Sequence, residues 1–187
     1  LSTETDANNT AVQSIYAVRD QTGDSLPRPM DRTTLASRTI SSVAGSGGAT
    51  FYSISGSPVN WVTQRGWVID LNTPVGARVI YPPQFVNNKL VLVSAVAPAQ
   101  NAVVCDASTG SGLNLVIPVE GGLNPSSPMF DVNGDGAYNS SDASVSGYGT
   151  NAGGITAVVR SRGMGGMEGA RGLIGDDDPS GGGGGGR

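Results

Sequence analysis

The stretch GWVIDLNTPVGARVIYPPQFVNNKLVLVSAVAP, residues 66–98, contains the clearest signals of the fold. Short apolar runs rich in Val, Ile and Leu alternate with turn residues, which is typical of β-strands rather than helices. Pro82 and Pro83 end one run, because proline lacks the N–H that a strand ladder needs. Asn87 and Asn88 separate QFV from KLVLVSAV, and asparagine tolerates the positive φ of a tight turn. The stretch therefore predicts strands joined by at least one tight hairpin.

The same pattern continues along the 187-residue chain, whose 29 Gly and 11 Pro make it rich in turns. No helix-length amphipathic pattern lies between the apolar runs, so the spacing predicts an all-β fold of antiparallel strands. We expect strands at 14–20, 34–40, 49–55, 61–71, 78–81, 89–96, 102–106, 113–119 and 155–160.

Charge and residue content exclude several classes of function. Eleven basic against fifteen acidic residues give a net charge of −4, so no basic stripe is present for binding nucleic acid. The chain has no histidine and only one cysteine, Cys105, which excludes Ser-His-Asp catalysis and His/Cys zinc sites. No apolar run reaches the length of a membrane span. The opening LSTETDANNT lacks the pattern of a signal peptide, so we expect none there.

Two segments of the chain resemble each other. IYAVRDQTG (15–23) and AVVCDASTG (102–110) both read as an apolar strand, then Asp, then Thr-Gly. In each copy the glycine would supply positive φ in the turn after the strand. Their separation suits repeated propeller blades, although two loose copies of a common hairpin ending also arise by chance.

The end of the chain differs from the rest in composition. Residues 163–187 have almost no apolar periodicity, and 181–186 are all glycine, which is typical of a flexible coil. We therefore expect a β-rich segment at 1–162 and a Gly-rich tail at 163–187. The acidic run 176–178 in this tail is expected to be a solvated charge cluster.

One motif carries a specific chemistry. Residues 131–142 read D-x-N-x-D-G-x-x-x-x-x-D, the pattern of an EF-hand-type loop. Ca²⁺ takes six to eight oxygen ligands at about 2.3–2.6 Å, which a tightly turning loop supplies from alternate residues. A glycine stands at the sixth place, where such a loop turns sharply. The expected ligands are Asp131, Asn133, Asp135, the Ala137 carbonyl, Asn139 directly or through water, and Asp142.

Other interpretations of these residues remain open. The loop is alternatively an Asn/Asp-Gly turn with solvated carboxylates, while Mg²⁺ is disfavoured because its octahedron usually keeps several waters. Two prolines precede the loop, so of the usual flanking helices only a short one at 140–146 is compatible with the sequence. Trp61, Trp67 and Tyr81 would suit a sugar-binding platform, but such rings on a sheet are more often part of the core.

With these motifs, the chain resembles the C-terminal region of the PilY1 family of type IV pilus assembly proteins and tip adhesins. The resemblance covers roughly residues 14–160, and IYAVRD is similar to a blade strand of that family. The family commonly has an acidic residue at the ninth place of the loop, where this chain has Asn139. The matching motifs occur in chain order: Gly66, Trp67, Asp70 and Leu71; Ala77, Arg78 and Val79; the strand 90–94; Pro128 and the loop 130–136.

The resemblance implies a partial, quinoprotein-like β-propeller with an inserted EF-hand-like calcium loop and no catalytic site. It implies a bacterial extracellular protein that lies with the pilus at the cell surface, favours pilus assembly over retraction and contributes to adhesion. Partners would be minor pilins or other chains of the same surface assembly, and a host or abiotic surface ligand. Two alternatives are a structural calcium-stapled subunit of an extracellular fibre or surface layer, and a fragment of a calcium-dependent secreted enzyme.

Overall fold

The computed structural model describes residues 10–20, 23, 31–97 and 111–150 of the chain. The chain divides into two units, Leu1–Gly154 and Ile155–Arg187, and everything described below belongs to the first. The strands expected at 102–106 and 155–160, the second copy of the repeat and the tail at 163–187 lie outside the described residues. Those expectations, and the boundary after residue 162, stay predictions.

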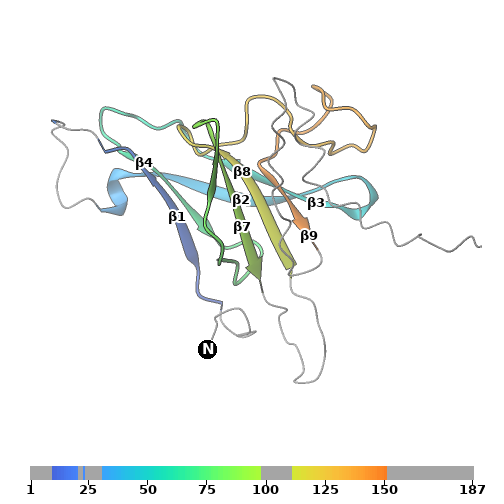
Figure 1. Cartoon of the computed structure of the whole chain (residues 1–187), viewed down its shortest axis with the longest axis horizontal. Helices are drawn as coiled ribbons and strands as arrows, with labels where there is room; N and C mark the ends of the chain where they lie inside the picture. The colour runs from blue at the N-terminus through green and yellow to red at the C-terminus, as the bar shows by residue number, and fades with distance from the viewer. Residues whose placement is uncertain (1–9, 21–22, 24–30, 98–110, 151–187) are drawn as a thin grey trace, which may run out of the picture. The chain divides into compact units, whose positions relative to one another are not determined.

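Nine strands form one mixed sheet in the described part of the chain (Figure 1). The only helices among these residues are two short 3-10 turns, η2 (Arg32–Thr34) and η3 (Ser46–Gly48), and no described helix has the length and apolarity needed to cross a membrane. The expected all-β class is confirmed. The strands are β1 (Gln13–Val18), β2 (Ala36–Ala44), β3 (Thr50–Ser55), β4 (Gly66–Leu71), β5 (Arg78–Val79), β6 (Gln84–Val86), β7 (Leu90–Ala97), β8 (Ser111–Pro118) and β9 (Gly147–Thr150).

The strand order is β1-β4-β2-β3-β9-β8-β7-β5, with β6 also pairing with β7. Pairing is antiparallel as expected, except that Ala36–Arg38 of β2 runs parallel to β4. The rest of β2, from Thr39 onward, pairs with β3. β2 thus joins two groups of strands, β1 and β4 on one side and β3, β9, β8, β7 and β5 on the other. Figure 1 shows β2 crossing the direction of β1, β7 and β8. The segment between β3 and β4 returns the chain to the other edge of β2, so that β4 lies parallel to β2. No local sequence pattern predicts this parallel pairing.

The two ends of this sheet approach each other. β1 and β5 are the terminal strands of the order, and the Val79 backbone N–H donates to the side-chain oxygen of Gln13 at 3.3 Å. The sheet is therefore nearly closed and barrel-like. This arrangement agrees with the β-propeller-like fold that the resemblance implies.

Both faces of β4 and β8 are buried, and β7 is buried on one face and half-buried on the other, which explains their continuous apolar sequences. On β7, Val91, Val93 and Ala95 contribute to a core on the inner face of the sheet. Leu90 and Leu92, which point the other way, pack in a second cluster on the outer face. A sheet with one solvated face would instead show strict alternation of apolar and polar residues.

The hairpin expected at Asn87 and Asn88 is confirmed. These residues have φ values of 51° and 55°, and Val86 pairs with Leu90 across the turn. Gly23, the last residue of the first repeat copy, also has the expected positive φ, at 85°.

The strand expected at 61–71 starts only at Gly66, so the prediction is wrong for residues 61–65. The Asn60 carbonyl accepts hydrogen bonds from the backbone N–H groups of Thr63 and Gln64, and these bonds turn the chain. Trp61 lies in this turn with the Arg19 guanidinium 5.4 Å from its ring. Trp67, in contrast, is buried in the core and donates its indole N–H to the Val119 carbonyl at 2.8 Å. The two rings therefore do not form a sugar-binding platform.

Candidate functional site

All six expected ligand residues lie on one loop between β8 and β9 (drawn in yellow and orange in Figure 1). Asn124 fixes both ends of this loop to β3. Its side-chain oxygen accepts from the Ile54 backbone N–H and the Ser146 hydroxyl, both at 2.7 Å. Its amide nitrogen donates to the Ser53 hydroxyl at 2.8 Å and to the Ser144 carbonyl at 2.7 Å. One side chain thus joins the start of the loop, its end and the strand beneath it.

Apolar side chains hold the loop against the outer face of the sheet. Phe130 and Val132 are buried in the outer cluster with Phe51, and the Phe130 ring centroid lies 6.1 Å from that of Phe51. Asp131 and Asn133 alternate with these anchors and stay outside the cluster. The order Phe-Asp-Val-Asn therefore places apolar side chains on the sheet and oxygen donors in the loop.

Backbone amides surround the Asp131 carboxylate. One oxygen accepts from Gly134 N at 2.7 Å and Asp135 N at 3.1 Å, and the other accepts from Gly136 N at 2.8 Å. Gly136 has a φ of 82°, so the sharp turn expected at the sixth place is confirmed. Gly134 also has positive φ, at 76°. Two glycines in the left-handed region allow the chain to fold tightly around this one side chain.

Asp142 closes the loop from the other end, and only 6% of its surface is exposed. One carboxylate oxygen accepts from Asn139 N at 3.1 Å, and the other accepts from Val132 N at 2.8 Å and Asn133 N at 3.3 Å. The bond from Asn139 and those from Asn133 and Val132 lower the pKa of the Asp142 carboxyl, against the opposing effect of burial. Because the donors are backbone amides, Asp142 stays ionised without a neighbouring cation.

The remaining expected ligands form small turns within the loop. The Asn133 amide donates to one Asp135 oxygen at 3.0 Å, and Ala137 N donates to the other at 2.8 Å. The Asn139 side-chain oxygen accepts from Ser141 N at 2.8 Å. Residues 140–146 form turns and irregular backbone, so the short helix compatible with the sequence is not formed there.

The donor chemistry of the loop fits a hard cation. It offers three carboxylates, two side-chain amides and one carbonyl, which are the ligand types that Ca²⁺ takes. A carboxylate has about four acceptor sites, so Asp131 and Asp142, which each use three for N–H groups, both retain one. Among the residues that the structure describes, however, no three acidic, His or Cys side chains are gathered as a metal group. Calcium binding stays a prediction.

The loop also contacts the tip of the β2–β3 hairpin. Ser46 N donates to the Val132 carbonyl at 2.9 Å. A Cβ on Gly134 would lie 2.6 Å from the Ser46 hydroxyl oxygen, so a glycine is required for this close approach. The motif in the sequence pointed to the ligands but not to Ser46, Val132 or Asn124, which position the loop. The nearest signal in the sequence is NPSSP, which begins at Asn124, and its two prolines indicate only that no helix precedes the loop.

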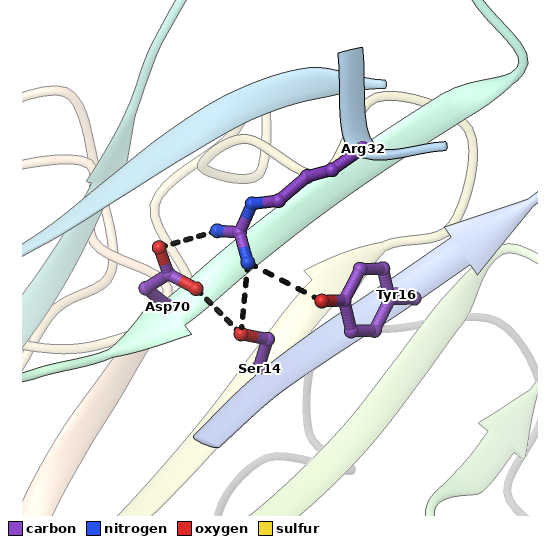
Figure 2. A network of polar contacts seen from close by, with 4 residues as sticks. All are labelled: Ser14, Tyr16, Arg32 and Asp70. Carbon is purple, nitrogen blue, oxygen red and sulfur yellow. Dashed lines mark hydrogen bonds and ion pairs between the residues drawn. The ribbon is translucent and has the colours of Figure 1, made fainter. Parts of the chain in front are cut away.

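A second polar cluster lies on the exposed face of β1 and β4 (Figure 2). Arg32 forms an ion pair with Asp70 and donates to the Tyr16 hydroxyl at 3.2 Å, and Ser14 donates to Asp70 at 2.5 Å. The hydrogen bond from Arg32, followed by that from Ser14, lowers the pKa of Asp70. This network, which we call the Arg32 clamp, attaches the segment before β2 to the other two strands. Asp70 of the Gly-Trp-x-x-Asp-Leu motif is therefore a structural residue.

Comparisons with known proteins bear on the fold. No known family model matches the chain, and no curated protein matches it either. Among solved structures, the chain is similar to the crystal structure of the Pseudomonas aeruginosa PilY1 C-terminal domain, with a TM-score of 0.55 and 22% sequence identity. The match covers 79% of this chain and 33% of that one, so the chain spans about one third of the solved domain. The chain thus has a PilY1-like fold, as its sequence motifs predicted.

Proposed function

We propose that this chain is a non-enzymatic, calcium-binding segment of a protein associated with type IV pili at the bacterial surface. The observation that carries the proposal is the likeness of its fold to the PilY1 C-terminal domain. The ordered motifs of the sequence support the same relationship. The EF-hand-type loop, attached to β3 and to the β2–β3 hairpin, supports the calcium part of the proposal.

In this proposal, Asp131, Asn133, Asp135, the Ala137 carbonyl, Asn139 and Asp142 hold the cation. Bound Ca²⁺ would neutralise three carboxylates that otherwise repel one another. The protein's own part is to keep those groups on one loop, with Phe130 and Val132 anchored beneath them. The cation therefore acts on stability and local order rather than on a reaction.

At the level of the cell, the segment would favour pilus assembly over retraction and contribute to adhesion. Its partners would be minor pilins or other chains of the surface assembly, and it would lie outside the cell with the pilus. A tagged chain should accordingly occur at pilus tips together with minor pilins. Regular repetition of the tag along a filament would instead favour a structural fibre or surface-layer subunit.

Thermal unfolding in calcium and in chelator tests the cation site. Extracellular calcium modules have Kd values of about 10⁻⁴–10⁻³ M. At about ten times Kd, binding adds roughly 1.4 kcal/mol, which raises the Tm of a chain of this size by about 3–6 °C. Asp131→Ala should abolish the rise, because it removes a carboxylate ligand. Glu120→Ala, which removes an exposed carboxylate outside the ligand segment 131–142, should retain it.

Identical melting curves for the unmutated chain in calcium and in chelator would contradict the calcium site. Pilus display is a separate measurement. If a double Asp131→Ala, Asp135→Ala variant binds no calcium yet leaves pilus number and retraction unchanged, calcium has no regulatory role in the pilus. The structural role of the loop would then stand.

A further inference from the structure

The backbone of Val132 connects the candidate cation loop with a different part of the sheet. Its N–H donates to the Asp142 carboxylate at 2.8 Å. Its carbonyl accepts from Ser46 N, at the tip of the β2–β3 hairpin, at 2.9 Å. The two groups belong to adjacent peptide planes, so a displacement of Val132 changes both bonds together. An expected metal ligand and the hairpin tip are thus separated by one residue.

Close packing reinforces this connection. A Cβ on Gly45 would lie 2.3 Å from the Phe51 ring and 3.1 Å from the Val132 carbonyl oxygen. A Cβ on Gly134 would lie 2.7 Å from the Ser46 Cβ. The hairpin tip and the loop therefore meet with no room for a side chain at Gly45 or Gly134. Packed contacts of this kind transmit displacement because the interior is nearly incompressible.

We propose that the tip of the β2–β3 hairpin, residues 45–49, is the element that responds to the cation state of the loop, through Val132. The proposal rests on the calcium binding proposed above and names the part of the surface that binding alters. When the cation orders Asp142 and the loop, Val132 holds its carbonyl toward Ser46 and the tip is fixed. Without the cation, the same bond opens more often.

The tip suits this role because it has few other restraints. Ser46, Gly47 and Gly48 are exposed, and Gly47 and Gly48 have φ values of 64° and 80°. Its other hydrogen bonds are local, from Gly45 N to the Ala49 carbonyl and from Ala49 N to the Ser46 carbonyl. The bond from Ser46 N to the Val132 carbonyl therefore links the tip to the loop, within the described residues. Its loss would free the tip without unpairing β2 and β3.

Hydrogen exchange of the full chain, measured on peptides that contain residues 45–49, tests the proposal. Saturating calcium should slow exchange at the tip by about two- to tenfold, the factor that one backbone hydrogen bond is worth. Ser46→Pro removes the donor and places a ring carbon where the N–H pointed at the Val132 carbonyl, so it breaks this contact outright. The extended backbone of Gly45, with φ −110° and ψ −176°, is compatible with a following proline. Ser46→Ala is the matched control, since it retains the N–H.

We expect the calcium effect at the tip in the unmutated chain and in Ser46→Ala, and its loss in Ser46→Pro. Because coupling is reciprocal, Ser46→Pro should also weaken calcium binding in a titration by a similar factor. If calcium binds in the titration but leaves exchange at the tip unchanged, this inference is wrong and the proposed calcium site stands. If no calcium binds, both proposals fail.

A second measurement tests the connection without the cation. In chelator, Asp142→Asn replaces the ionised acceptor of Val132 N by a neutral amide. Exchange at 45–49 should then rise by about two- to tenfold. Glu120→Gln, which makes the same change at an exposed position, should leave it unaltered. Unchanged exchange at the tip in Asp142→Asn would overturn the proposed route through Val132.

Discussion

Asp70 and Asp142 both have a lowered pKa, yet they are held in different ways. Asp70 is bound by the side chains of Arg32 and Ser14 on an exposed face. Asp142 is nearly buried and is bound by three backbone amides. Mobile side chains lose entropy when they pair, and salt screens their charges. Backbone amides that the fold already fixes incur neither cost, so we expect the loop to be held more firmly than the Arg32 clamp.

The largest effect should come from the side chain that anchors the loop. Asn124→Ala removes four hydrogen bonds and leaves Ile54 N without its acceptor. We expect a loss of about 2–4 kcal/mol in the free energy of unfolding, measured by urea titration in chelator. Asn72→Ala is the matched control. Within the described part of the chain, its side-chain oxygen has only a 3.5 Å contact with the Thr73 hydroxyl, so the change should stay within about 0.5 kcal/mol. Equal losses in the two variants would refute the anchoring role of Asn124.

An intermediate loss of stability is expected when either glycine of the loop is replaced by alanine, and the loss should be larger at Gly134 than at Gly136. Gly134 and Gly136 both have positive φ, so alanine at either position is strained and costs about 1–2 kcal/mol. Only at Gly134 does the added Cβ meet the hairpin tip, since Gly136 has nothing within 4 Å. We therefore expect Gly134→Ala to lose roughly 1 kcal/mol more than Gly136→Ala in the same urea titration. If the two losses are equal, contact with the tip contributes nothing to stability.

The smallest effect should come from the clamp. Asp70→Asn should lose at most about 1 kcal/mol, because the Arg32 and Asp70 side chains are 46% and 39% exposed. The loss should shrink in 1 M salt. Since folding lowers the Asp70 pKa, its stabilisation is present above the ordinary value of 3.8 and is lost as the pH falls through the folded-state value. Melting curves of Asp70→Asn and the unmutated chain should therefore converge in acid. Glu120→Gln, which neutralises an exposed carboxylate outside the clamp, is the control and should differ little from the unmutated chain at any pH. A difference that persists in acid would contradict the clamp.

The sequence predicted those parts of the fold that depend on neighbouring residues. Asn87 and Asn88 supply the positive φ of a hairpin whatever surrounds them, and the turn formed as expected. Likewise, the glycine at position 136 marked the turn of the loop. The family motifs predicted the PilY1-like fold because each motif is a short strand or turn segment, and several of them occur in the family's order along the chain.

What the sequence did not predict depends on contacts between distant residues. β9 was missed because GYGT has two glycines and weak strand propensity. The structure requires one of them, since a Cβ on Gly147 would lie 2.2 Å from the Asn114 carbonyl oxygen of the neighbouring strand. The parallel pairing of β2 with β4 and the contact between Ser46 and Val132 have the same origin. No periodicity within a segment reports which distant backbone will approach it.

The near-closure of the sheet depends on contacts between residues far apart in the chain, which has a consequence for folding. Ser14 and Asp70 are separated by 56 positions in the chain, and Gln13 and Val79 by 66. Pairings this distant form slowly, because the intervening chain must first lose its entropy of loop closure. Until then β1, whose sequence QSIYAV carries no charge, has no partner strand along either edge. An uncharged strand of this kind pairs readily with other chains, so the protein is most prone to aggregation before β4 reaches β1.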